Sequence, residues 1–101
     1  MNERILTLLG FASKSGKLAY GFDMSVESVK KGKSKLLLTA DDVSEKSQKE
    51  VIYFADKSNV EYIILKGIST ETLSNAIGKS CGIVSVNDSG FAKAIGGNAN
   101  D

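Results

Sequence analysis

The chain has 101 residues and lacks histidine, proline and tryptophan, and its only cysteine is Cys81. Without histidine, a Ser-His-Asp triad, a histidine-ligated metal and an imidazole pH switch are all excluded. A single cysteine excludes an internal disulfide and a zinc site built from several thiolates, and it is typical of a reducing compartment. These absences remove most of the familiar catalytic and metal centres.

Long apolar segments are also absent, since no stretch approaches the roughly 18 residues that a membrane-spanning helix requires. The first residues form no charged-then-apolar leader, because Asn2, Glu3 and Arg4 lead directly into an amphipathic pattern. Hydrophobic residues make up 42% and charged residues 25%, the composition of a soluble domain with one core. We therefore expect a cytoplasmic protein without a membrane partner, with a single domain over residues 1–95 and a flexible polar tail over residues 96–101.

Charge is distributed unevenly, although the net charge is only +1. Residues 1–35 contain seven basic and three acidic side chains, whereas residues 36–101 contain six basic and nine acidic side chains. The positive excess lies in the first third of the chain, where four lysines fall between positions 30 and 35. Such an asymmetry favours an edge that binds a polyanion such as nucleic acid. The alternative is a solvated helix end, because lysines near a helix C-terminus interact favourably with the macrodipole.

Helical and extended patterns alternate along the sequence. Apolar residues recur at helical spacing in five segments, and the first of these segments has Ile5, Leu8, Leu9 and Ala12 on one face. Segments of the other kind, such as residues 35–40 and 62–65, are mostly apolar without alternation, which is typical of strands buried on both faces. Residues 18–20 and 83–86 complete the predicted strands. The sequence thus predicts an α/β fold, a three-layer α/β/α sandwich around a central four-stranded mixed sheet.

Two Gly-Lys pairs, Gly16-Lys17 and Gly78-Lys79, invite comparison with phosphate-binding loops. That motif requires two glycines five positions apart, followed by Lys and a hydroxyl residue, between a strand and a helix. Both pairs fail this test, because their spacing differs and each pair follows a predicted helix. We therefore predict no nucleotide-triphosphate site.

Three further residues could carry chemistry. The adjacent carboxylates Asp41 and Asp42 follow a predicted strand, and without a third ligand nearby we interpret them as caps of the next helix rather than as metal ligands. Cys81 lacks the histidine that usually activates a catalytic thiol, so we expect it to be a buried or loop thiol. We predict a non-enzymatic protein with no cofactor and no metal.

Several short motifs occur in a specific order. The first helix contains Leu9-Gly10-Phe11-Ala12, the turn after it contains Gly16-Lys17-Leu18, and the last helix begins with Asp88-Ser89-Gly90-Phe91-Ala92. Between them, residues 31–44 add Lys-Gly-Lys-Ser-Lys and Ala-Asp-Asp-Val-Ser. In this order and spacing, over residues 2–95, the chain resembles the kink-turn RNA-binding superfamily of large-subunit ribosomal proteins, the seven-Ae and thirty-e group. Within it, the chain is similar to the short bacterial YlxQ-type branch. The resemblance implies the sandwich fold and a ribosome-associated role in translation as a binder of structured RNA.

The resemblance also implies a site. In that family, RNA contacts the N-terminal end of the second helix and the loop before the last main strand. Helix N-terminal amides favour phosphate, and side chains there reach the exposed edges of G·A pairs in a sharply bent RNA. The RNA-binding residues that the resemblance implies are Gly21, Phe22, Asp23, Met24 and Glu27 in the helix, Lys79, Ser80, Cys81 and Gly82 in the loop, and Lys14, Lys17, Lys33 and Lys35 on phosphates.

The helix start departs from the family's strongest binders, which read Gly-Ala-Asn-Glu-x-x-Lys where this chain reads Gly-Phe-Asp-Met-Ser-Val-Glu over residues 21–27. Asp23 accepts hydrogen bonds but does not donate as an amide does. Met24 has no strong acceptor, and Glu27 places an anion where the family has a cation against the phosphate backbone. An alternative function is therefore a protein-interaction module on the same fold with a degenerate RNA surface.

These residues also have purely structural interpretations. Acidic residues such as Asp23 and Glu27 are favoured near a helix start by the macrodipole alone. Phe22 shares an apolar stripe with Val26 and Val29, which indicates a core position as readily as a stacking platform for RNA.

Overall fold

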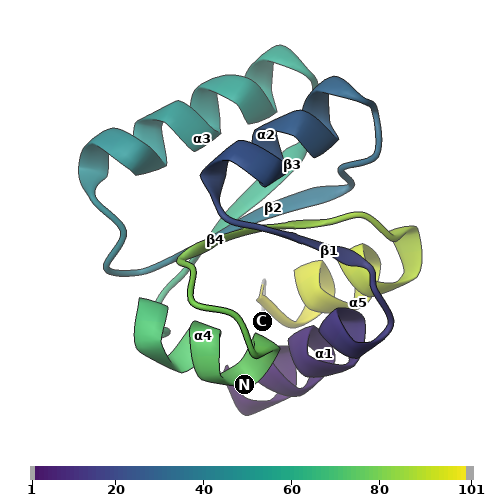
Figure 1. Cartoon of the computed structure of the whole chain (residues 1–101), viewed down its shortest axis with the longest axis vertical. Helices are drawn as coiled ribbons and strands as arrows, with labels where there is room; N and C mark the ends of the chain where they lie inside the picture. The colour runs from purple at the N-terminus through teal and green to yellow at the C-terminus, as the bar shows by residue number, and fades with distance from the viewer. Residues whose placement is uncertain (1, 100–101) are drawn as a thin grey trace.

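The structure is a computed structural model that describes residues 2–99. In this part of the chain, four strands form one sheet and five helices cover its two faces (Figure 1), which confirms the predicted three-layer sandwich. The strands are β1 (Leu18–Tyr20), β2 (Leu36–Ala40), β3 (Glu61–Leu65) and β4 (Ile83–Val86). The helices are α1 (Asn2–Lys14), α2 (Phe22–Lys30), α3 (Glu45–Lys57), α4 (Thr70–Ile77) and α5 (Ser89–Ala99). None of these helices is both long enough and apolar enough to cross a membrane.

The sheet has the strand order β1-β4-β2-β3 and is mixed, as predicted. Strand β4 runs antiparallel to both of its neighbours, whereas β2 and β3 are parallel. Val86 in β4 is opposite Leu18 on one side and Leu36 on the other. The last strand in the sequence is therefore central, and it connects the first strand to the second.

The two faces of the sheet bury cores of different size. Helices α1, α4 and α5 cover one face and enclose the large core, which includes Leu9, Leu38 and Leu73 (Figure 1). Helices α2 and α3 cover the other face and enclose the small core, which consists of Val29, Leu37, Val51, Ala55 and Ile83 with partly buried neighbours. Successive strand residues point to opposite faces, so Leu37 and Leu38 contribute to different cores.

Strand β3 differs from its sequence interpretation. Residues 62–65 were expected to form a buried strand, but Tyr62 is 38% exposed and Leu65 is the one fully buried residue of β3. The physical reason is its position, because β3 lies at the edge of the sheet and the helical layers cover it only in part.

Helix α5 is longer than predicted. It continues through Gly96 and Gly97 to Ala99, where the sequence predicts a flexible tail from residue 96. The amide of Asn98 donates to the Ala94 carbonyl at 2.8 Å and supports the last turn. Residues 100 and 101 of the predicted tail lie outside the described residues.

The predicted capping of the next helix by Asp41 and Asp42 is not what the structure shows: Asp42 binds the start of α4 instead, and Asp41 binds a turn. Ser44 caps α3, whereas Asp42 Oδ1 accepts the backbone N–H of Thr70 at 2.8 Å and its hydroxyl at 2.7 Å at the start of α4. Asp41 Oδ2 accepts the N–H of Gly67 at 3.0 Å. The hydrogen bonds from Thr70 hold the pKa of Asp42 below its usual value. The pair thus ties the turn after β2 to the turn after β3.

Candidate functional site

A groove of about 490 Å³ lies between β1, the exposed side of α2 and the residues that flank β4. We call it the α2 groove. Its lining residues come from two segments that are far apart in the sequence, residues 18–33 and residues 79–87. Its lining residues are Leu18, Ala19, Tyr20, Met24, Glu27, Ser28, Lys31, Lys33, Lys79 and Asn87.

The N-terminal end of α2 is anchored beside the loop that precedes β4. Gly21 caps the helix with a φ of 86°, which residues other than glycine adopt at a cost. Its N–H donates to the Ile83 carbonyl at 2.7 Å. Burial raises the pKa of the Cys81 thiol, and hydrogen bonds from the backbone of Gly21 and Ile83 oppose this rise. The structure therefore brings together the two segments that the family resemblance implies.

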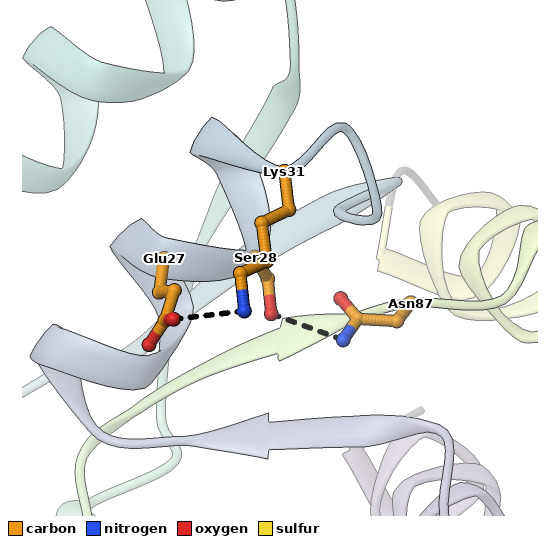
Figure 2. Close-up of polar contacts among 4 residues, drawn as sticks. All are labelled: Glu27, Ser28, Lys31 and Asn87. Atoms are coloured by element: carbon orange, nitrogen blue, oxygen red, sulfur yellow. Dashed lines mark hydrogen bonds and ion pairs between the residues drawn. The ribbon is translucent and has the colours of Figure 1, made fainter.

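The floor of the groove is a network of hydrogen-bonded side chains. Asn87 Nδ2 donates to Ser28 Oγ at 3.1 Å (Figure 2), and Asn87 Oδ1 accepts the Ser85 hydroxyl at 2.6 Å. Ser85 Oγ also lies 2.7 Å from Oγ of the buried Ser34. These contacts fix the orientation of the Asn87 amide and use one of its two N–H groups.

One wall of the groove carries an ion pair. Lys31 Nζ lies 2.9 Å from Glu27 Oε1, one helical turn away (Figure 2). The hydrogen bond and the charge of Lys31 lower the pKa of Glu27, and Lys33 and Lys30 add to this effect. The anion at position 27, which departs from the family pattern, is thus neutralised by a neighbouring cation. The i,i+4 spacing of Glu27 and Lys31 is a signal that the sequence already contained.

The opposite wall carries a fixed aromatic ring. The Tyr20 hydroxyl lies 2.6 Å from Ser13 Oγ, which donates to the Ile77 carbonyl at 2.7 Å. Because the Ser13 proton is used in this second bond, the Tyr20 hydroxyl is the donor in the first. Lys79 Nζ lies over the Tyr20 ring, 5.8 Å from its centroid.

The predicted residues of α2 separate into two groups. Met24, which is 55% exposed, and Glu27 line the groove, whereas Asp23 is exposed on the first turn without lining it. Phe22 points to the other side of α2 and packs against the small core, where its ring meets that of Phe54 edge-on at 6.2 Å. Phe22 therefore occupies a position on the core, as its apolar stripe with Val26 and Val29 indicated.

The predicted loop and lysine residues separate in the same way. Lys33 and Lys79 line the groove, but Lys14, Lys17 and Lys35 are exposed elsewhere. Ser80 lines a different hollow of about 570 Å³ on α4. Gly82 packs tightly, since a Cβ there would lie 2.7 Å from Thr70 Oγ1 and 2.8 Å from Val43 Cγ2.

Six groove residues were not among the predicted site residues: Leu18, Ala19, Tyr20, Ser28, Lys31 and Asn87. The i,i+4 spacing from Glu27 could have identified Lys31. Tyr20 and Asn87 come together through the pairing of β1 with β4, for which the sequence pattern gives no signal.

Comparison with known proteins places the chain in a family. Residues 3–95 match the family described as Ribosomal protein L7Ae/L30e/S12e/Gadd45 family. The chain belongs to this family. It is 30% identical to the RNA-binding protein YlxQ of Enterococcus faecium over 92 residues, and this aligned segment covers 90% of this chain and 86% of that protein. It is 34% identical over 90 residues to the large ribosomal subunit protein eL30 of Candida glabrata, which covers 87% of this chain and 85% of that protein. The match confirms the predicted resemblance and the prediction of a non-enzymatic protein.

Solved structures confirm the fold. A protein of unknown function from Bacillus halodurans C superimposes with a TM-score of 0.91 at 22% identity, covering 97% of this chain and 98% of that one. The Giardia lamblia 15.5kD RNA binding protein superimposes with a TM-score of 0.78 at 14% identity, covering 98% of this chain and 84% of that one.

Proposed function

We propose that this chain binds structured RNA of the kink-turn type through the α2 groove, as a cytoplasmic factor associated with the ribosome. The observation that carries the proposal is the groove, which gathers Lys31, Lys33 and Lys79 around a floor of hydrogen-bonding side chains along the exposed side of α2. The names of its relatives, an RNA-binding protein and a ribosomal protein, support the same function.

Different residues of the groove contact the phosphates and the bases of the RNA. Lys33 and Lys79 provide flexible cations for phosphates, and such contacts position an RNA without reading it. Asn87 offers an amide donor in the groove, and Asp23 offers a carboxylate acceptor outside it, on the exposed first turn of α2; both groups can bind base edges that a bent, non-Watson–Crick RNA exposes. A regular duplex hides those edges, because the A-form major groove is too narrow for side chains.

The Glu27–Lys31 pair explains how RNA approaches a helix that carries an anion. Because the opposite charges of Glu27 and Lys31 lie 2.9 Å apart, their electrostatic potentials largely cancel at the position of an approaching phosphate group. The lysines at positions 33 and 79 then determine the sign of the potential in the groove.

The test is a titration of the full chain against a fluorescently labelled kink-turn RNA and a straight duplex of equal length. We expect the kinked RNA to bind at least about tenfold more tightly, and the logarithm of its affinity to fall with the logarithm of salt with a slope of about −3. Equal binding of both RNAs would reduce the function to unspecific charge attraction. A kink-turn RNA that stays free at low salt and micromolar protein would overturn the proposal.

A pair of lysine variants locates the site. Lys33→Ala is expected to weaken kinked-RNA binding about fivefold and to reduce the salt slope by about 1, because one phosphate contact is lost. Lys93→Ala removes an exposed lysine from α5, on the opposite layer, and should leave both quantities unchanged. If Lys93→Ala has the larger effect, the RNA binds another face.

The second candidate, a protein-interaction module, is favoured by a different surface. Tyr53 is 59% exposed on α3, in a hollow of about 520 Å³ that Phe54, Lys46 and Lys49 also line. A partner that stays bound after ribonuclease treatment and is lost in Tyr53→Ala supports this function. A partner that ribonuclease releases argues against it.

A further inference from the structure

We infer that the Tyr20 ring, with Lys79 above it, forms a stacking subsite for one unpaired nucleobase. The inference rests on the proposed function and deepens it by assigning one part of the groove to a base rather than to phosphate. Tyr20 lies at the end of β1, directly before the glycine that begins α2, so its ring forms the wall opposite the Glu27–Lys31 pair.

The first argument is that the ring is held in place before any ligand arrives. The hydroxyl of Tyr20 is bound to Ser13 Oγ at 2.6 Å, and Ser13 is bound to the Ile77 carbonyl at 2.7 Å. Tyr20 also packs against the large core. A platform fixed by α1 and α4 loses little conformational entropy when a base stacks on it.

The second argument is the cation on the exposed side of the ring. Lys79 Nζ lies 5.8 Å from the ring centroid, in the loop that follows the left-handed Gly78. Ammonium groups and nucleobases both bind the faces of aromatic rings. A base that stacks on Tyr20 takes the place of the ammonium group, which then moves to the phosphate of the same nucleotide. The contact between the ammonium group and the ring is thus replaced by two contacts, that of the base with the ring and that of the ammonium group with the phosphate.

The third argument is the groove in which the ring lies. Asn87 also lines the groove, and hydrogen bonds with Ser28 and Ser85 fix the orientation of its amide. Met24 adds a polarizable apolar side chain. The volume of about 490 Å³ lies in the range of small-molecule sites. The Tyr20 ring lies at one end of β1 and Asn87 at the other, where its backbone N–H donates to the Lys17 carbonyl at 2.8 Å, so the groove offers an aromatic platform and, farther along, a polar contact for the neighbouring part of the RNA.

The experiment uses the full chain and a kink-turn RNA in which each unpaired nucleotide is replaced in turn by an abasic one. At one of these positions, loss of the base is expected to weaken binding by the wild-type chain about tenfold. Equal binding of all abasic RNAs and the intact RNA overturns the subsite while leaving the proposed function standing. Failure of every RNA to bind overturns the proposed function and the subsite with it.

Two variants connect that base to Tyr20. Tyr20→Phe keeps the ring and should still distinguish the abasic RNA about tenfold. Tyr20→Leu should bind the intact RNA about tenfold more weakly and no longer distinguish the two, with an unchanged salt slope because the ring carries no charge. If Tyr20→Leu weakens binding of both RNAs equally, the ring has only a structural role. Because the wild-type comparison needs no variant, a folding defect in Tyr20→Leu does not remove the test.

Discussion

The two layers of helices differ in what they bury and in what they expose. Helices α1, α4 and α5 enclose the large core, whereas α2 and α3 enclose a core of few buried residues. The thinner layer also provides one wall of the α2 groove, through Met24, Glu27 and Lys31. The comparison indicates a division in which one layer supplies most of the stability and the other can vary its outer face without losing the fold.

Adjacent leucines in β2 give the sharpest test of this division. Leu38→Ala opens the large core and is expected to lower the free energy of unfolding by about 4 kcal/mol, whereas Leu37→Ala opens the small core and should cost about 3 kcal/mol. The difference arises because a cavity between three helices and the sheet collapses less readily than one in the thinner layer. Urea unfolding followed by circular dichroism measures both values. A larger loss for Leu37→Ala would reverse the comparison.

Gly82 lies where the two layers meet, since its loop leaves α4 and passes against Val43 just before α3. Gly82→Ala is expected to destabilise the chain by about 2 kcal/mol, because the new Cβ would lie 2.7 Å from Thr70 Oγ1. Gly97→Ala in α5 is the matched control. Its Cβ meets nothing within 4 Å, so a gain of about 0.5 kcal/mol is expected. Thermal unfolding distinguishes the two, and an unchanged midpoint for Gly82→Ala would show that the layers can separate locally.

Reversing one charge on the thinner layer should change RNA binding and leave stability within experimental error. Glu27→Lys converts the neutral pair with Lys31 into two cations, so affinity for a kink-turn RNA is expected to rise about fivefold at low salt, with a steeper salt slope. Glu61→Lys makes the same change of charge on β3, at the far edge of the sheet. Equal gains for both variants would mean that only net charge matters. Fluorescence anisotropy at several salt concentrations provides the measurement.

The smallest expected effect is on the stability of the chain at low pH. Hydrogen bonds from Thr70 keep the pKa of Asp42 below its usual value in the folded chain. A lowered folded-state pKa contributes stability above the unfolded-state pKa, near 4, and this contribution is lost as the pH falls through the folded-state pKa. The melting temperature should therefore fall less between about pH 4 and pH 2 in Asp42→Asn than in the wild type. Identical pH profiles for the two chains would contradict this.

Periodicity in the sequence predicts the helices, the strands and the layers, because each element buries its own apolar stripe. It does not predict that residues 61–65 lie at an edge, since a run of apolar residues does not reveal how many neighbours a strand has. The family pattern locates the start of α2 and the loop before β4. It does not predict the ring of Tyr20 or the amide of Asn87, because their proximity depends on pairing between residues nearly seventy positions apart.

The central place of β4 has a consequence for synthesis of the chain on the ribosome. Strand β1 is hydrogen-bonded to β4 alone, so residues 18–20 have no partner until residues 83–86 have left the exit tunnel. Lys79 and Asn87 emerge in the same late interval. A polypeptide that stops before β4 therefore has neither the partner strand of β1 nor the groove residue Asn87.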